Sequence, residues 1–273
     1  MVKNKLATTL SVLFSVSIFF ISCKKNDIPG TKPSPNPVAK KLWKIKTNDN
    51  DSTLFAYTTT GELHKVIKTE EGSGDDVVTY TFIYTPTSIV SEIATSMGEK
   101  HKFVYEGNRL KLIENYVGPN KASEYFFEYS DNRLSTTFVR TPSRANNGGP
   151  LYNPTFKITY SYDASGELKK VASYAINPNT NAQTKVNEKE INQYDNNKNP
   201  LGILSPLTLA RAFEFAGEHN ITRQTLYNRL GQIEETTMNS YVYDDDKYPV
   251  TSTSTLTPNI GSPTTTNFKY YYK

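Results

Sequence analysis

The stretch FKITYSYDASGELKKV, residues 156–171, contains the pattern that decides the fold of this chain. Aromatic and branched residues occupy every second position up to Tyr162, which is the period of a β-strand with one buried face. Asp163 to Gly166 then supplies turn residues, and Leu168 opens the next strand. The stretch therefore predicts an antiparallel hairpin whose first strand ends in a tyrosine.

The same unit recurs along the chain: a terminal tyrosine, a short polar turn and a branched apolar residue. Most copies are roughly 20 to 35 residues apart, which suits one hairpin and one connection per unit. The chain is therefore predicted to be a succession of antiparallel hairpins. Copies occur at Tyr57 with Leu63, Tyr105 with Leu110, Tyr129 with Leu134, Tyr162 with Leu168 and, more loosely, Tyr227 with Leu230.

Several of the returning strands have two branched apolar residues three positions apart. In a regular strand such residues point to opposite faces. Either both faces are covered near this point, or one bulged residue brings both side chains inward and curls the sheet. The spacing occurs from Leu63 to Val66, Leu110 to Ile113, Leu168 to Val171 and Leu230 to Ile233.

Residues 205–217 break the alternation. Ser205 can cap a helix, Pro206 suits its first position and Gly217 suits its end. The apolar residues between them fall on one helical face, which is expected to pack on the core. The predicted fold is all-β, a curved antiparallel sheet or partly closed barrel of repeated hairpins, with one short helix near residues 205–216.

The N-terminal segment has the layout of an export signal, with two lysines followed by an apolar run from Leu6 to Ile21. The run is shorter than the roughly 20 apolar residues of a spanning helix. Cys23, the only cysteine of the chain, follows it. Residues 20–23 resemble the bacterial lipobox, although Phe20 and Ile21 are bulkier than that pattern prefers. The resemblance implies cleavage before Cys23 and acylation of this residue with palmitate-like chains; a free buried cysteine is the alternative.

Residues 24–40 consist mainly of Lys, Asn, Pro, Thr and Ser and cannot bury a core. The chain is therefore divided into a lipoprotein signal peptide at 1–22, a lipidated cysteine with a disordered tether at 23–40, and a single domain of hairpin repeats at 41–273. Loss of residues 1–22 lowers the net charge from +4 to about +2. With no block of basic residues, this charge does not indicate a nucleic-acid partner.

The side chains that often carry chemistry show no motif. His64, His101 and His219 lack the spacing of zinc ligands and are expected to face solvent. Residues 244–246 and 75–76 offer acidic oxygens to calcium, but the first group is better explained as a turn. No hydrolase, metalloprotease or phosphate-loop signature occurs. No catalytic, cofactor-binding or metal-ligating residue is predicted.

Tyrosine is abundant, with 19 residues. Its ring can stack on sugars, but it is also a preferred strand residue, and most of the tyrosines are expected to need no ligand. Residues 270–272 are three consecutive tyrosines, which places tyrosine on both faces of the last strand. We expect this strand to lie inside the sheet and to close it against a neighbour.

Residues 160–168 resemble the Tyr-Asp repeat of the RHS and teneurin shells, in which long hairpins wrap into a hollow casing. More of the chain resembles Bacteroidota lipoproteins of unknown function with a porin-like β fold. The matching pieces, rich in Tyr-Asp and Asn-Pro pairs, are residues 194–201, 219–222 and 241–250. The resemblance implies a lipid-anchored, sheet-rich envelope protein and supplies no catalytic residue.

The expected function is that of a non-enzymatic binding or scaffold protein on the bacterial outer membrane, facing either the periplasm or the cell surface. Its partners would be the membrane, through the Cys23 anchor, and a glycan or another envelope protein. The alternative is a glycan-directed hydrolase with a dispersed carboxylate site in the concavity of the sheet. Its candidate carboxylates are Glu188, Glu190, Glu234 and Glu235, which are otherwise expected to be solvated.

Overall fold

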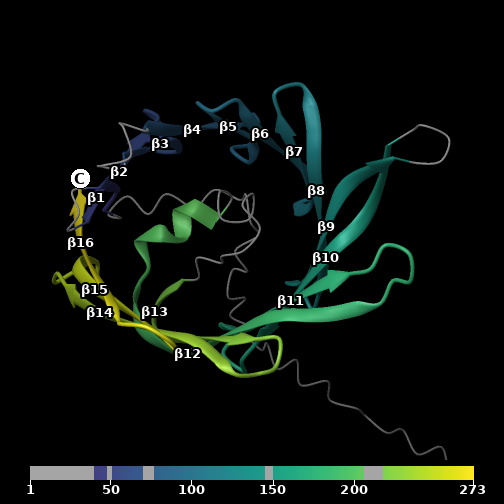
Figure 1. The fold of residues 1–273 in the computed structure, drawn as a ribbon. Coiled ribbons are helices and arrows are strands. Elements are labelled where there is room, and N and C mark those ends of the chain that lie inside the picture. The colour runs from purple at the N-terminus through teal and green to yellow at the C-terminus, as the bar shows by residue number, and fades with distance from the viewer. Residues whose placement is uncertain (1–39, 48–50, 70–76, 145–149, 206–217) are drawn as a thin grey trace, which may run out of the picture.

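A computed structural model describes residues 40–47, 51–69, 77–144, 150–205 and 218–273, without the side chains of 142–153. In this part of the chain, sixteen antiparallel strands form one closed barrel (Figure 1). The barrel closes because β1 (Leu42–Thr47) pairs with β16 (Thr264–Tyr272). The expectation of a curved sheet or partly closed barrel is therefore corrected to full closure, and the last strand is an inner one, as its tyrosines indicated.

All the strands from β2 to β15 pair with the strands before and after them in sequence, so the topology is a simple up-and-down meander. The strands between β1 and β16 are β2 (Ser52–Tyr57), β3 (Leu63–Thr69), β4 (Val77–Tyr84), β5 (Val90–Thr95), β6 (Glu99–Glu106), β7 (Arg109–Val117), β8 (Asn120–Ser130), β9 (Arg133–Arg144), β10 (Pro150–Tyr162), β11 (Leu168–Ile176), β12 (Gln183–Lys198), β13 (His219–Asn228), β14 (Ile233–Tyr243) and β15 (Pro249–Pro258).

The two ends of the barrel differ. One end, the tyrosine rim, holds the connections that follow the even-numbered strands, and there the barrel is closed by hydrogen bonds between the backbones of Lys41 and Lys273, with N···O distances of 3.0 and 2.9 Å. The opposite rim holds the connections that follow the odd-numbered strands. All the repeats of the tyrosine-turn unit except one lie at the tyrosine rim.

The predicted bulges are present where strands leave the tyrosine rim. Ala56 pairs with Lys65 but Tyr57 pairs with Leu63, so His64 is the extra residue of β3. Leu63 and Val66 are consequently both buried. β7 has the same bulge, and the sheet curls toward its apolar face at each of these points.

The copy of the repeat at Tyr227 was assigned wrongly. Its turn joins β13 to β14 at the opposite rim, and Leu230, which should open a buried strand, is 71% exposed. A tyrosine, an asparagine and a glycine suit a tight turn at either rim. Local turn chemistry therefore does not distinguish the two ends of a barrel.

Side chains alternate between the lumen and the outside. On β4, Phe82 is 2% exposed, whereas its neighbour Ile83 is 45% exposed. The inward side chains of β1 to β9 form one apolar cluster. Its fully buried members include Val66, Tyr80 and Ile113. The hydrophobic effect therefore stabilises this barrel from within the lumen.

A short 3-10 helix, η1 (Pro200–Leu204), lies inside the barrel (Figure 1). The Asn199 side chain caps it by accepting a hydrogen bond from the Leu201 backbone N–H at 3.0 Å. Leu201 and Leu204 pack against the apolar cluster. The first residues of the segment between β12 and β13 thus contribute to the core. The apolar helix face predicted for this segment lies outside the described residues.

The helix predicted near 205–216 lies, from residue 206 on, outside the described residues. Ser205 does not have the role assigned to it, because its φ of −47° and ψ of −42° are helical and an N-cap residue is extended. Its hydroxyl instead donates to the Gly202 carbonyl at 2.8 Å. No helix in the described residues has the length and apolar character needed to cross a membrane.

Candidate functional site

A girdle of tyrosine hydroxyls runs around the tyrosine rim. Each tyrosine lies at or near the end of an even-numbered strand and donates to a backbone carbonyl at or near the start of the strand before it. Among the described residues there are eight such bonds: Tyr57 to Leu42 (2.7 Å), Tyr84 to Leu63 (2.7 Å), Tyr105 to Val90 (2.9 Å), Tyr129 to Leu110 (2.8 Å), Tyr162 to Leu134 (2.9 Å), Tyr194 to Leu168 (2.7 Å), Tyr241 to Ile221 (3.1 Å) and Tyr272 to Pro249 (2.8 Å).

The girdle has a clear structural role. At this rim each even strand is joined to the following odd strand by a turn, or by the segment containing η1, or, for β16, by barrel closure. The tyrosine joins the same strand to the preceding odd one, so neighbouring strands are tied on both sides. Burial raises the pKa of all eight phenols, to about 12 for Tyr129. These phenols stay neutral and remain hydrogen-bond donors at physiological pH.

Basic side chains lie over three of the girdle rings, those of Tyr57, Tyr129 and Tyr162. The Arg133 guanidinium lies 5.4 Å from the centre of the Tyr162 ring and contacts the turn at Gly166, where an added Cβ would lie 2.5 Å from its Nη2. Gly166 has a φ of +94°, which favours glycine over other residues. Arg109 covers Tyr129 in the same way and donates to Asn132 in the next turn. The turns are therefore linked to one another around part of this rim.

The lumen wall is less apolar on β12 to β14 than on β1 to β9. Tyr241 faces the lumen, since it bonds to Ile221 beside Asn239, which donates to the same carbonyl at 2.8 Å. Strand alternation then places Thr237 and Glu235 on the same face. The pairing of β13 with both β12 and β14 adds Lys189 and Gln224 to that face.

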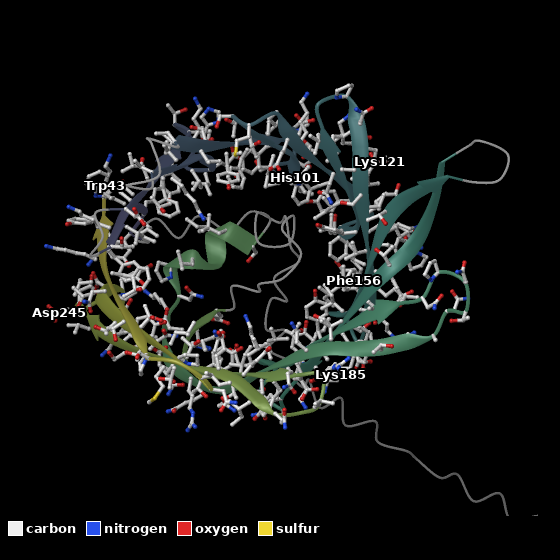
Figure 2. The ribbon with its side chains drawn as sticks, in the orientation of Figure 1. Trp43, His101, Lys121, Phe156, Lys185 and Asp245 are labelled. Atoms are coloured by element: carbon white, nitrogen blue, oxygen red, sulfur yellow. The ribbon has the colours of Figure 1, made fainter. Side chains whose placement is uncertain are left out.

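A second polar group lies on β6 to β8, across the barrel from β13 and β14 (Figure 1). His101 is 7% exposed, and its Nδ1 lies 2.7 Å from Asn115 Oδ1. Asn115 Nδ2 donates to Ser123 Oγ at 2.9 Å, so the amide oxygen accepts from the imidazole. This tautomer leaves Nε2 as an acceptor, and Nε2 is buried without a hydrogen-bond partner. The expectation that His101 faces solvent was therefore wrong (Figure 2).

A hydrogen-bonded cluster supports η1 at the tyrosine rim. Asn220, 3% exposed, donates through Nδ2 to Tyr243 Oη at 3.2 Å and to the Lys198 carbonyl at 3.1 Å. Tyr243 donates to Asp195, which also accepts from the Asn197 backbone at 2.9 Å. Burial, together with the neighbouring Asp195 carboxylate, raises the pKa of Tyr243. This cluster fixes both ends of the segment that enters the lumen.

Two pairs of neighbouring carboxylates lie on the outer surface, Glu114 with Glu124 and Glu188 with Glu190, and all four form ion pairs with lysines. Lys121 contacts both Glu114 and Glu124, which face each other on β7 and β8. Glu188 accepts from Lys170 at 2.8 Å and from Lys185 at 2.6 Å. Hydrogen bonds and ion pairing lower the pKa of Glu114 and Glu188, whereas the acid of a glycosidase needs a raised pKa. Neither pair offers the proton donor of the hydrolase alternative.

The other candidate residues have ordinary structural roles. Asp244 accepts hydrogen bonds from the backbone of Asp246 and Tyr248, both at 3.0 Å, so this acidic run is a turn as expected. Lys40 Nζ lies 2.7 Å from the carboxylates of both aspartates. His219 bonds to Glu167 at 2.6 Å. Within the described residues there is no cluster of three His, Cys, Asp or Glu able to hold a metal.

His64 is exposed, as expected, and Glu234 is exposed on β14. Glu190 lies 3.4 Å from Lys169. Cys23 and the acidic residues 75–76 lie outside the described residues. Within the part of the chain that the structure describes, the sequence-based candidates are not brought together in one site. The polar lumen groups come from residues that carried no motif.

The comparisons with known proteins agree with this barrel. No family model and no curated protein matches the chain. A porin-like protein from Bacteroides uniformis is similar in structure over 85% of this chain and 96% of its own, with 13% sequence identity and a TM-score of 0.52. The chain has a porin-like fold. The predicted resemblance to Bacteroidota proteins of this type is thereby confirmed at the level of the fold.

A second porin-like protein, from Bacteroides vulgatus, covers 85% of this chain and 99% of its own length, with 14% identity and a TM-score of 0.46.

Proposed function

We propose that this chain is a lipid-anchored protein of the outer membrane whose porin-like barrel stands outside the bilayer and serves as a non-enzymatic binding scaffold. The observation that carries the proposal is the polarity of the barrel wall. A barrel that crosses a membrane has an apolar outer band about 25 Å tall and a polar interior. Here the apolar cluster of β1 to β9 faces the lumen, and charged side chains such as Lys100, Lys102 and Glu114 face outward.

The outer surface of β6 illustrates this polarity. His101, Phe103 and Tyr105 point inward, which leaves Lys100, Lys102 and Val104 on the outside. A lysine at the midplane of a bilayer costs about 2–4 kcal/mol in a transmembrane barrel. The ion pairs on β7, β8, β11 and β12 add further charge to the same surface. Insertion of this wall into hydrocarbon is strongly disfavoured.

The length of the wall supports the same arrangement. β5 has six residues and is bounded by described turns on both sides. A membrane-crossing strand needs about 9–11 residues. A barrel outside the bilayer needs another attachment, and the segment ending at Cys23 supplies one. The two polar lumen groups, around His101 and around Asn239, are the part of the scaffold best suited to bind a polar partner such as a glycan.

The placement of the barrel can be tested by thiol labelling, because acylated Cys23 has no free thiol and is the only cysteine. In isolated membranes, single cysteines from Lys102→Cys and Ser240→Cys, both outward and exposed in mid-strand, should react with a membrane-impermeant maleimide as fast as a cysteine in the exposed turn at Asn259. Val66→Cys, buried in the lumen, should not react. Protection of the outward cysteines until detergent is added would show that the barrel is embedded.

The anchor has its own test. Inhibition of the lipoprotein signal peptidase with globomycin should leave a longer, uncleaved precursor, and Cys23→Ala should leave a precursor that takes up no lipid label. The control variant Ser22→Ala keeps a small residue before the cysteine and should be lipidated normally. Unchanged lipid labelling of the Cys23→Ala protein would refute the anchor without affecting the placement of the barrel.

A further inference from the structure

The outer surface along the seam between β1 and β16 differs from the rest of the barrel. β15, β16, β1, β2 and β3 are consecutive in the sheet, and none of these strands contains Asp or Glu. Elsewhere on the wall, lysines such as Lys121 and Lys170 are paired with glutamates. This part of the wall is therefore basic, although the whole chain is nearly balanced in charge.

Two lysines of this sector face each other directly. Lys46 on β1 pairs with Lys269 on β16, and like charges in directly opposed positions destabilise a sheet. Lys44 lies on the same outer face of β1. Among the described residues, no ion pair is formed by any of these three side chains. Their charges are available to an external anion.

Two aromatic side chains accompany these lysines. Tyr270 and Tyr272 point into the barrel, so Tyr271 points outward. The ring of Trp43, the bulged residue of β1, lies 6.0 Å from the Tyr271 ring (Figure 2). Lys273 lies 5.0 Å from the centre of the Trp43 ring. The bulge aims the only tryptophan of the chain out of the wall beside the basic residues.

We propose that this surface, formed by Trp43, Lys44, Lys46, Lys269, Tyr271 and Lys273 and here called the seam patch, docks the barrel on an anionic phospholipid membrane. Tryptophan and tyrosine favour the interface between hydrocarbon and headgroups, and lysine is attracted to anionic headgroups. Half of the seam patch lies on β1, the strand that follows the segment from Cys23, so a lipidated tether would hold the patch near the bilayer. The orientation of the barrel on the bilayer therefore rests on the proposed function, whereas the affinity of the seam patch for anionic lipid does not.

The test uses the chain from residue 23 with Cys23→Ala, which retains every strand of the barrel and cannot be acylated. It is titrated with vesicles of phosphatidylcholine alone or mixed with phosphatidylglycerol. The fluorescence of Trp43 should shift to shorter wavelength with the anionic vesicles only, and salt should weaken binding. Because no lipid anchor is present, this result is independent of whether Cys23 is acylated in the cell.

Two sets of charge-reversal variants distinguish the effect of the charge in the seam patch from the effect of the net charge of the barrel. Reversal of three seam lysines, Lys44→Glu with Lys46→Glu and Lys269→Glu, should weaken vesicle binding on the order of 100-fold or more, since each lysine near the surface contributes about fivefold. The same reversal at Lys100, Lys102 and Lys157, outward on β6 and β10, should weaken it far less. If the triple variant does not fold, Lys46→Gln with Lys269→Gln removes the repulsion instead.

Three results would overturn the proposal. One is the absence of a fluorescence shift with anionic vesicles, and another is an equal loss of binding in the two sets of variants. The third is a shift with dextran sulfate but not with vesicles, which would assign the seam patch to an anionic glycan instead. Co-sedimentation with the vesicles provides a reading that does not depend on Trp43.

Discussion

Phe82→Ala is expected to lower the free energy of unfolding by about 3–5 kcal/mol. Phe82 is 2% exposed within the apolar cluster of the lumen, so its truncation removes buried apolar surface and leaves a cavity. Chemical denaturation of the purified barrel, followed by circular dichroism, measures the change in unfolding free energy.

The neighbouring residue provides a matched control. Ile83 precedes the turn on the same strand but faces outward, and Ile83→Ala should cost about 1 kcal/mol or less. A barrel that buries its outer surface in lipid would lose stability at Ile83 as well. Equal losses at the two positions would therefore contradict the inside-out distribution of apolar residues on which the proposed function rests.

Alkaline pH is expected to unfold this barrel, because its buried tyrosines ionise more readily in the unfolded chain than in the folded one. Burial raises the pKa of Tyr129 in the girdle, and of Tyr160 outside it, from 10 to about 12, and it raises the pKa of the other girdle tyrosines too. The stabilisation from keeping these phenols neutral is fully present below pH 10. It is lost as the pH rises from 10 toward the folded pKa, at up to about 1.4 kcal/mol per pH unit for each tyrosine.

A few such tyrosines are enough to offset the roughly 5–15 kcal/mol of a typical domain, so unfolding and tyrosinate formation should coincide in one steep transition above pH 10. Denaturant unfolding at a series of pH values, with ultraviolet absorbance reporting tyrosinate, checks this. Tyr129→Phe should reduce the pH dependence, whereas Phe82→Ala should lower the whole curve without changing its slope. An unfolding free energy that stays constant well above pH 10 would show that the girdle phenols are not buried.

The repeated hairpins were predictable because turn chemistry and period two are local. Asp163 shows why the prediction was incomplete: its carboxylate accepts from the Glu167 backbone at 3.0 Å, and Thr85 accepts from Ile89 at 3.2 Å in the equivalent turn. A threonine hydroxyl replaces the aspartate there, as Thr58 does after Tyr57. The copy that begins at Tyr84 went unrecognised because Ser88, with a φ of +64°, stands where the turn after Tyr162 has glycine. His101 could have been placed correctly, because strand alternation puts it on the same face of β6 as the apolar residues Phe103 and Tyr105.

Other features were not available from the sequence. Closure depends on a pairing between β1 and β16 that no local pattern encodes, although the tyrosines on both faces of β16 indicated an inner strand. The tyrosine girdle depends on contacts between strands rather than within them. The polar lumen groups were missed because Asn115, Ser123 and Asn239 belong to no motif and acquire their environment only when the barrel closes.

The pairing of β1 with β16 also constrains how the chain folds. Fifteen of the sixteen strand pairings join neighbours in sequence and can form as the chain emerges, but the last must join residues more than 200 positions apart. Until Lys273 meets Lys41, two unpaired strand edges are exposed to other chains. Closure is therefore the step at which aggregation competes with folding, and factors that shield open strand edges during export should raise the yield of the barrel.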